Sequence, residues 1–328
     1  MITRRKFVVA TGAGGAGALA PLASFAQQPA KIWRIGMLET TSLALNSANL
    51  DAFLKGMREL GYVEGTNFVI DYRSADGRVE RFPELATELL RGKVDLIVTR
   101  GTPATQAVMK ATKTIPVVTT AIGDPLTLVA SLARPGGNVT GLSSVMADLS
   151  AKRLQLLTEL VPRATRIAVL MNMANAAFPQ FWKETERAAR LLRVQVQLYD
   201  VRRTEDLQRA FEAAVKQRAN ALVIGQDGLI QANGKLVVEL ASKHRLPAIH
   251  AAGEYVDDGG LISYGVIYAD FYRRAASYVD KILKGAKPGD LPIEQPMRFE
   301  LTINMKTAKT LGLKVPQSIL IQATKVIE

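Results

Sequence analysis

The sequence has 328 residues, no cysteine, and a formal net charge of +12 at pH 7. This length allows two domains of ordinary size, and the lack of cysteine excludes disulfides, thiolate metal sites and a cysteine nucleophile. The basic residues are interspersed with acidic ones and form no basic run with interleaved aromatic residues. We therefore expect no nucleic-acid partner.

Residues 1–26 have the layout of a secretory signal peptide. Three basic residues precede a run of small and apolar ones, and small side chains end the segment at Ala26. The run is shorter than the roughly 20 apolar residues that span a bilayer. Residues 3–8 (Thr-Arg-Arg-Lys-Phe-Val) resemble a twin-arginine export signal, although an ordinary secretory signal stays open.

We expect export to the periplasm with cleavage near Ala26. The removed segment carries three basic and no acidic residues, so cleavage lowers the net charge from +12 to +9. Because there is no cysteine to carry a lipid, we expect the mature chain to be free and not membrane-anchored.

The glycines at 12–17 match the G-x-G-x-x-G pattern of dinucleotide-binding folds. A helix would have to follow the third glycine, but residues 18–30 contain Pro21 and Pro29 and lack a helical apolar period. We therefore expect no nucleotide cofactor at this segment, and no other cofactor.

The rest of the chain alternates between short apolar runs and amphipathic segments. Strands are predicted at 32–38, 67–72, 94–99, 115–119, 166–171, 194–199, 221–224, 248–251 and 261–264, and helices at 49–60, 81–90, 126–132, 152–160, 178–192, 204–218, 234–244 and 269–284. A further helix is expected to open at 102–103. This order favours βαβ units with parallel sheets. The fold class we predict is α/β, with two doubly wound parallel-sheet lobes joined by crossing strands.

Open α/β sheets bind ligands beyond the carboxyl ends of their strands, so the cleft between the lobes is the expected site. Loops rich in hydroxyl, amide and glycine groups follow these ends. The candidate ligand-binding residues are Thr40, Thr41, Gly101, Thr102, Thr105, Asp124, Ser144, Asn172, Gln226, Asp227, Glu254 and Tyr264. Thr102 is expected as the N-cap of a helix whose positive end suits a carboxylate, and Asp124 suits either an ammonium group or a turn.

Residues of the kind that catalysis needs are scarce. His244 and His250 are the only histidines, and no nucleophile-elbow, zinc-protease or phosphate-loop motif occurs. His244 is expected to have a structural role at a helix end, and His250 lies near the cleft. We expect neither an enzyme nor a metal site. Phe178, Tyr255 and Tyr264 are candidates for stacking on an aromatic solute or for packing in the core.

Several motifs together resemble one protein family. They are Gly-Thr-Pro-Ala-Thr at 101–105, Gly-Asp-Pro at 123–125, residues 132–141, 152–157, 259–265 and 281–288, and the tail at 303–313. The chain resembles the ABC-transporter substrate-binding family that includes tryptophan and tyrosine receptors. The resemblance implies a type I periplasmic-binding-protein fold and an ABC membrane permease as partner.

The resemblance also implies where the lobes begin and end. Lobe 1 is expected to contain residues 31–142 and 266–294, and lobe 2 residues 143–265 and 295–328, with crossings near 140–144, 263–268 and 295–301. We predict a monomeric periplasmic receptor that delivers a small organic solute, an amino acid or a small carboxylate including aromatic ones, to an ABC importer. A ligand sensor for a signalling partner and a periplasmic enzyme are the alternatives.

Overall fold

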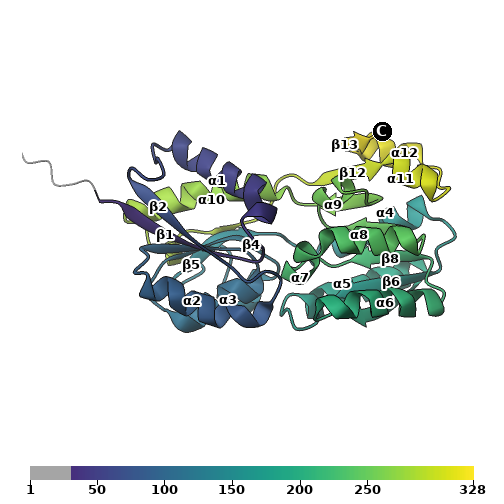
Figure 1. Ribbon diagram of the computed structural model, residues 1–328, viewed down its shortest axis with the longest axis horizontal. Coiled ribbons are helices and arrows are strands. Elements are labelled where there is room, and N and C mark those ends of the chain that lie inside the picture. The colour runs from purple at the N-terminus through teal and green to yellow at the C-terminus, as the bar shows by residue number, and fades with distance from the viewer. Residues whose placement is uncertain (1–30) are drawn as a thin grey trace, which may run out of the picture. The chain divides into compact units, whose positions relative to one another are not determined.

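The computed structural model describes residues 31–328, and residues 32–328 form one compact unit (Figure 1). The expected signal peptide lies outside the described residues. Two β-sheets organise this unit, one of six strands and one of seven. We call them sheet 1 and sheet 2.

Sheet 1 has the strand order β11-β5-β4-β3-β1-β2, and all of its strand pairs are parallel. Its strands are β1 (Trp33–Glu39), β2 (Phe68–Ser74), β3 (Leu96–Thr99), β4 (Val117–Ile122), β5 (Val139–Ser143) and β11 (Ile293–Glu294). Its helices are α1 (Ser47–Glu59), α2 (Phe82–Arg91), α3 (Thr102–Ala111) and α10 (Tyr268–Leu283).

The central strands of sheet 1, β1, β3, β4 and β5, are buried on both faces, whereas β2 at the edge is half-buried. Ile35 and Met37 of β1 pack in one apolar cluster with residues of α1 and α10, whereas Leu38 packs in another cluster with α2 and α3. Successive strand side chains point to opposite faces, which accounts for this alternation. Figure 1 shows α1 and α10 on one side of the sheet and α2 and α3 on the other.

Sheet 2 has the order β13-β12-β10-β9-β8-β6-β7 and is parallel except for the antiparallel pair β10–β12. Its strands are β6 (Arg166–Met171), β7 (Gln195–Asp200), β8 (Ala221–Ile224), β9 (Ala248–His250), β10 (Ile262–Gly265), β12 (Glu300–Asn304) and β13 (Lys325–Ile327). The helices of this part are α4 (Ser150–Leu160), α5 (Phe178–Leu192), α6 (Thr204–Lys216), α7 (Gly228–Ala232), α8 (Gly234–Lys243), α9 (Glu254–Asp257), α11 (Met305–Thr310) and α12 (Gln317–Gln322).

The chain passes between the two sheets three times. It leaves sheet 1 after β5, returns from sheet 2 after β10 into α10, and leaves again between β11 and β12. α10 contacts α1, β4 and β5, so it packs on sheet 1. The predicted α/β fold class with two mostly parallel sheets is therefore correct.

Three local expectations are wrong. The helix predicted at 126–132 is a single 3-10 turn at Pro125–Thr127, because seven residues before a Pro-Gly-Gly turn are too few to sustain a helix. Thr102 is not an N-cap: Gly101 caps α3 with a φ of 85°, and Thr102 is the first helical residue. The loop expected at 226–228 instead leads into α7, whose N-cap is Asp227.

Candidate functional site

A cavity lies where the loops at the carboxyl ends of the two sheets meet. The cavity itself has a volume of about 40 Å³, within a region of about 500 Å³ that includes open solvent. Its lining from the sheet 1 part is Thr40, Val79, Phe82, Arg100, Gly101, Thr102, Pro103, Ala121, Gly123 and Tyr268; the segment after β5 adds Ser144 and Met146; and its lining from the sheet 2 part is Asn175, Ala177, Gln226, Asp227, Gly228 and Gln231.

Six of the twelve candidate residues line this cavity: Thr40, Gly101, Thr102, Ser144, Gln226 and Asp227. The other six lie elsewhere: Thr41, Thr105, Asp124, Asn172, Glu254 and Tyr264. Thr41 is fully buried, and Thr105 bonds the hydroxyl of Thr99 at 2.9 Å. Asp124 precedes a 3-10 turn, Glu254 begins α9, and the ring of Tyr264 lies against Phe299.

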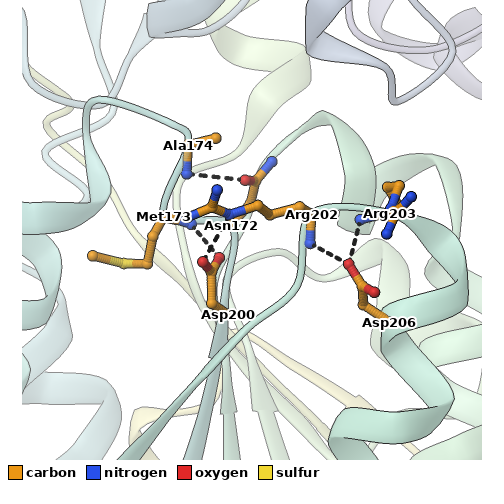
Figure 2. Close-up of polar contacts among 7 residues, drawn as sticks. All are labelled: Asn172, Met173, Ala174, Asp200, Arg202, Arg203 and Asp206. Atoms are coloured by element: carbon orange, nitrogen blue, oxygen red, sulfur yellow. Dashed lines mark hydrogen bonds and ion pairs between the residues drawn. The ribbon is translucent and has the colours of Figure 1, made fainter.

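Asn172 takes part in a network of polar contacts in sheet 2 (Figure 2). Its carbonyl oxygen accepts a bond from the N–H of Ala174, and the neighbouring Met173 N–H donates to Asp200 at 2.9 Å. Asp200 also accepts from Arg202, at 2.8 Å. These contacts join the loop after β6 to the end of β7. They position a loop near the cavity but do not line it.

Arg100 is the most prominent cavity residue that is absent from the candidates. It follows β3 directly and is only 4% exposed. Its guanidinium lies 4.0 Å from the ring centre of Tyr268, and its Nη1 contacts Asn46 at 3.5 Å. Its Nη2 is buried and has no hydrogen-bond partner among the described residues. Its position directly after a buried strand is the sequence feature that could have identified Arg100 as a candidate ligand-binding residue.

In residues 31–328, Arg100 forms no ion pair: no carboxylate lies within 4 Å of its guanidinium. Glu254 and Glu39 interact with it at longer range. Burial raises the pKa of Glu39 to about 7, and the Tyr272 hydroxyl and the charge of Arg100 oppose that rise. The Tyr272 hydroxyl donates to Glu39 at 2.6 Å. The positive charge of Arg100 is therefore not neutralised by a close partner.

Asp227 carries the opposite charge at the same cavity. Its Oδ1 caps α7 by accepting from the N–H of Ile230 at 3.1 Å, while its Oδ2 is buried and has no partner. Burial raises its pKa to about 6, and the N–H of Ile230 and the nearby side chain of Asn172 oppose that rise. At neutral pH the carboxylate is mostly ionised and has one oxygen available.

Two side-chain amides complete the polar lining. The Nε2 atoms of Gln226 and Gln231 are buried without hydrogen-bond partners in the described part of the chain. The Oε1 of Gln231 accepts from the Thr40 hydroxyl at 2.6 Å. Buried polar groups in proteins are nearly always bonded, so a bound solute or ordered water would supply the partners of these amides.

The start of α3 also faces the cavity, through Gly101, Thr102 and Pro103. Gly101 has a φ of 85°, which a residue with a side chain adopts only with strain. The Thr102 hydroxyl accepts from the N–H of Gly123 at 3.3 Å and so connects two loops of sheet 1. The positive end of a ten-residue helix adds to the charge of Arg100.

The aromatic and histidine candidates do not reach this cavity. Phe178 packs against Phe181, and Tyr255 stacks on His250 at 5.2 Å between ring centres. Burial lowers the pKa of His250 to about 4, so its ring is neutral. His244 is the C-cap of α8 and stacks on Phe211.

Within residues 31–328, no group of three or more His, Cys, Asp or Glu side chains is placed to hold a metal ion. No helix in this part of the chain is long and apolar enough to cross a membrane.

The family model for ABC transporter substrate binding proteins matches residues 37–327, which is most of the chain. This chain belongs to that family. The predicted family and function are thereby confirmed at this level: the chain is a substrate-binding protein of the ABC-transporter type.

Individual relatives agree with this result. The chain is 29% identical over 264 residues to the tyrosine-binding protein of Clostridioides difficile (strain R20291), covering 80% of this chain and 76% of that one. A Streptococcus pneumoniae ABC domain solved in complex with L-Trp superposes with a TM-score of 0.84 at 27% identity, covering 90% of this chain and all of that one.

A third relative is a substrate binding protein with adhesive properties from Clostridium difficile, solved in a ligand-free, open form. It superposes with a TM-score of 0.64 at 26% identity and covers 90% of this substrate-binding protein and 99% of its own chain. The solved structures confirm the type I periplasmic-binding-protein fold.

Proposed function

We propose that this protein is a periplasmic receptor that binds an α-amino acid and delivers it to an ABC importer. The proposal rests on one observation: Arg100 beside sheet 1 and Asp227 beside sheet 2 face the same cavity, and each has a buried polar atom without a partner. Such an arrangement is complementary to a zwitterion. The carboxylate of the solute would bind Arg100 and the start of α3, and its ammonium group would bind Asp227.

The physical reason is the cost of burying charge. An isolated buried charge is destabilising by several kcal/mol unless a partner is present. Here two opposite charges are held apart without an ion pair between them, which is useful only if a third group bridges them. The relatives that bind tyrosine and L-Trp support an amino acid as the solute.

We also propose that each sheet with its helices forms one lobe, with lobe 1 at 31–142 and 266–294 and lobe 2 at 143–265 and 295–328. The lobes would rotate about the three connections to open and close the cavity. The structure is more similar to the L-Trp complex than to the ligand-free, open relative, at nearly equal sequence identity. That difference supports assignment of the described arrangement to the closed form.

We further propose that residues 1–26 direct the chain to the periplasm through the twin-arginine route, and that the mature chain acts there as a monomer. Immunoblotting of periplasmic fractions from cells with and without a functional twin-arginine translocase tests the route. Arg4→Lys with Arg5→Lys should retain the precursor in the cytoplasm if the route is correct.

The binding proposal is tested by a thermal-shift screen of the purified protein with the twenty L-amino acids and a set of small aliphatic and aromatic carboxylates. A solute present at 100 times its Kd stabilises the protein by about 2.7 kcal/mol. We expect at least one amino acid to raise Tm and to be recovered unchanged by mass spectrometry. No shift with any amino acid would refute the proposed solute class, and turnover of the solute would indicate an enzyme.

A further inference from the structure

The loops of the two sheets meet along a narrow seam beside the cavity. We define the seam as Thr40, Gly77 and Gly123 on the sheet 1 side, and Ala177, Gly228, Gln231 and Ala232 on the sheet 2 side. One hydrogen bond crosses it, from the Thr40 hydroxyl to the Oε1 of Gln231 at 2.6 Å, and this bond is buried.

Glycines allow the two sides of the seam to approach closely. A Cβ added to Gly228 would lie 3.1 Å from the Cβ of Thr40, and the three nearest atoms it would meet all belong to Thr40. A Cβ on Gly77 would lie 2.8 Å from the Cβ of Ala232, and one on Gly123 would lie 2.8 Å from the Cβ of Ala177. At Gly77 and Gly123 an added Cβ would come closer than side chains pack, and at Gly228 it would require Thr40 to shift by a few tenths of an ångström.

Gln231 takes part in both the seam and the cavity. Its carbonyl oxygen accepts the bond from Thr40, and its amide nitrogen is buried without a partner in residues 31–328 while the residue lines the cavity. Gln231 belongs to α7, which is capped by Asp227, the residue proposed above to bind the ammonium group. One short helix therefore carries a contact to the solute and the contact to the opposite sheet.

We propose that Gln231 couples solute binding to closure, with its oxygen holding the Thr40 side of the cleft and its nitrogen binding the solute. This inference rests on the proposed function, since it requires a receptor that opens and closes. Solute bound to the nitrogen fixes the carboxamide in the orientation that presents its oxygen to Thr40. The bond and the glycine contacts exist only when the cleft is closed, so they set the balance between the open and closed forms.

Single substitutions separate these roles. Thr40→Val keeps the shape of the side chain and removes the hydroxyl, so it should lower the closed fraction and weaken solute binding about 2- to 12-fold, the effect of one hydrogen bond. Gly228→Ala adds a methyl group against Thr40 and should weaken closure about 5- to 150-fold. Gln231→Glu keeps an oxygen for Thr40 but loses the donor to the solute.

The chain has no cysteine, so a pair of engineered cysteines can be labelled without interference. Lys110→Cys in α3 and Lys216→Cys in α6 place donor and acceptor dyes on exposed positions beside the two sheets. Energy transfer between them is measured without solute and during titration with an equimolar mixture of the twenty L-amino acids. Circular dichroism and chemical unfolding check that each variant is folded.

We expect the mixture to change energy transfer in the wild type at the lowest concentration. Thr40→Val and Gly228→Ala should need proportionally more, and Thr40→Ser should restore wild-type behaviour. Gln231→Glu should respond weakly to the mixture. Thr87→Val makes the same chemical change on the exposed surface of α2 and should have no effect.

Two failures are distinguishable. If the wild type shows neither a change in energy transfer nor a thermal shift with any amino acid, the proposed function is wrong. If the wild type responds and Thr40→Val and Gly228→Ala respond at the same concentration, the coupling role is wrong. Equal energy transfer in all variants, with and without the mixture, likewise overturns it.

Discussion

Replacement of Arg100 by methionine should change solute affinity and protein stability in different ways. In the described chain the guanidinium has no carboxylate within 4 Å, and its Nη2 has no partner. Methionine removes a buried, unpaired cation, which stabilises the unliganded protein. It also removes the contact with Tyr268, worth about 1 to 2 kcal/mol, and a long hydrogen bond to Asn46.

Because the cost of the buried, unpaired cation is at least as large as the value of these contacts, we expect the free energy of unfolding of Arg100→Met to be no lower than that of the wild type. Binding should change far more. Loss of one partner of a buried charge pair costs about 3 kcal/mol or more, which is roughly 150-fold in Kd for a carboxylate solute. Arg100→Lys keeps the charge but loses the planar pair of donors, and it should bind about tenfold more weakly than the wild type.

Isothermal titration calorimetry with the best-binding amino acid gives the affinities, and urea denaturation gives the stabilities. A Kd for Arg100→Met within threefold of the wild type would show that Arg100 does not bind the solute. A loss of several kcal/mol of stability without solute would show that the arginine supports the fold instead.

Three further predictions concern the buried ionisable groups. Asp227→Asn should weaken binding of an amino acid about 100-fold but change the affinity for the corresponding des-amino acid by no more than about threefold. In the wild type, amino-acid affinity should fall as pH drops below about 6, because Asp227 becomes protonated there. Calorimetry at pH 5 to 8 measures both effects. Glu39 binds its proton more tightly in the folded protein than in the unfolded chain, so its contribution to stability is present below pH 4.5 and is lost as pH rises through about 7. Relative to Glu39→Gln, the wild type should lose about 3 kcal/mol of unfolding free energy between pH 4.5 and 8. A difference in unfolding free energy that stays constant with pH would contradict this. Burial holds His250 neutral in the folded protein. The free energy of unfolding of the wild type should therefore fall by about 3 kcal/mol relative to that of His250→Phe as pH drops from 6.5 to 4. Parallel acid denaturation curves for the two proteins would exclude the effect.

The sequence predicted the regular elements well where burial creates a pattern. Residues 221–224 and 178–192 have the observed bounds of β8 and α5, because a strand buried on both faces is continuously apolar and a long helix shows its period. α7 has five residues and no period to detect. It exists because Asp227 caps it and its residues pack against both the cavity and Thr40.

The site was only partly predictable, because sequence patterns locate loops but do not show how their side chains pack. The rule that ligands bind beyond strand ends identified loops containing Thr40, Thr102 and Asp227, which line the cavity. The Arg100 guanidinium lies against Tyr268, a residue far along the chain that returns to sheet 1 on α10. Residue type and spacing do not show which polar groups lack partners, because that depends on the three-dimensional packing.

The central claim is that Arg100 and Asp227 together select a zwitterion. The most direct test measures Kd by calorimetry for the best-binding L-amino acid, for the amine that lacks its carboxylate and for the acid that lacks its ammonium group. We expect the amino acid to bind at least 100-fold more tightly than either analogue, and Arg100→Met and Asp227→Asn each to remove the preference for the group that it binds. Equal affinity for all three compounds, or no binding of any L-amino acid, would contradict the account.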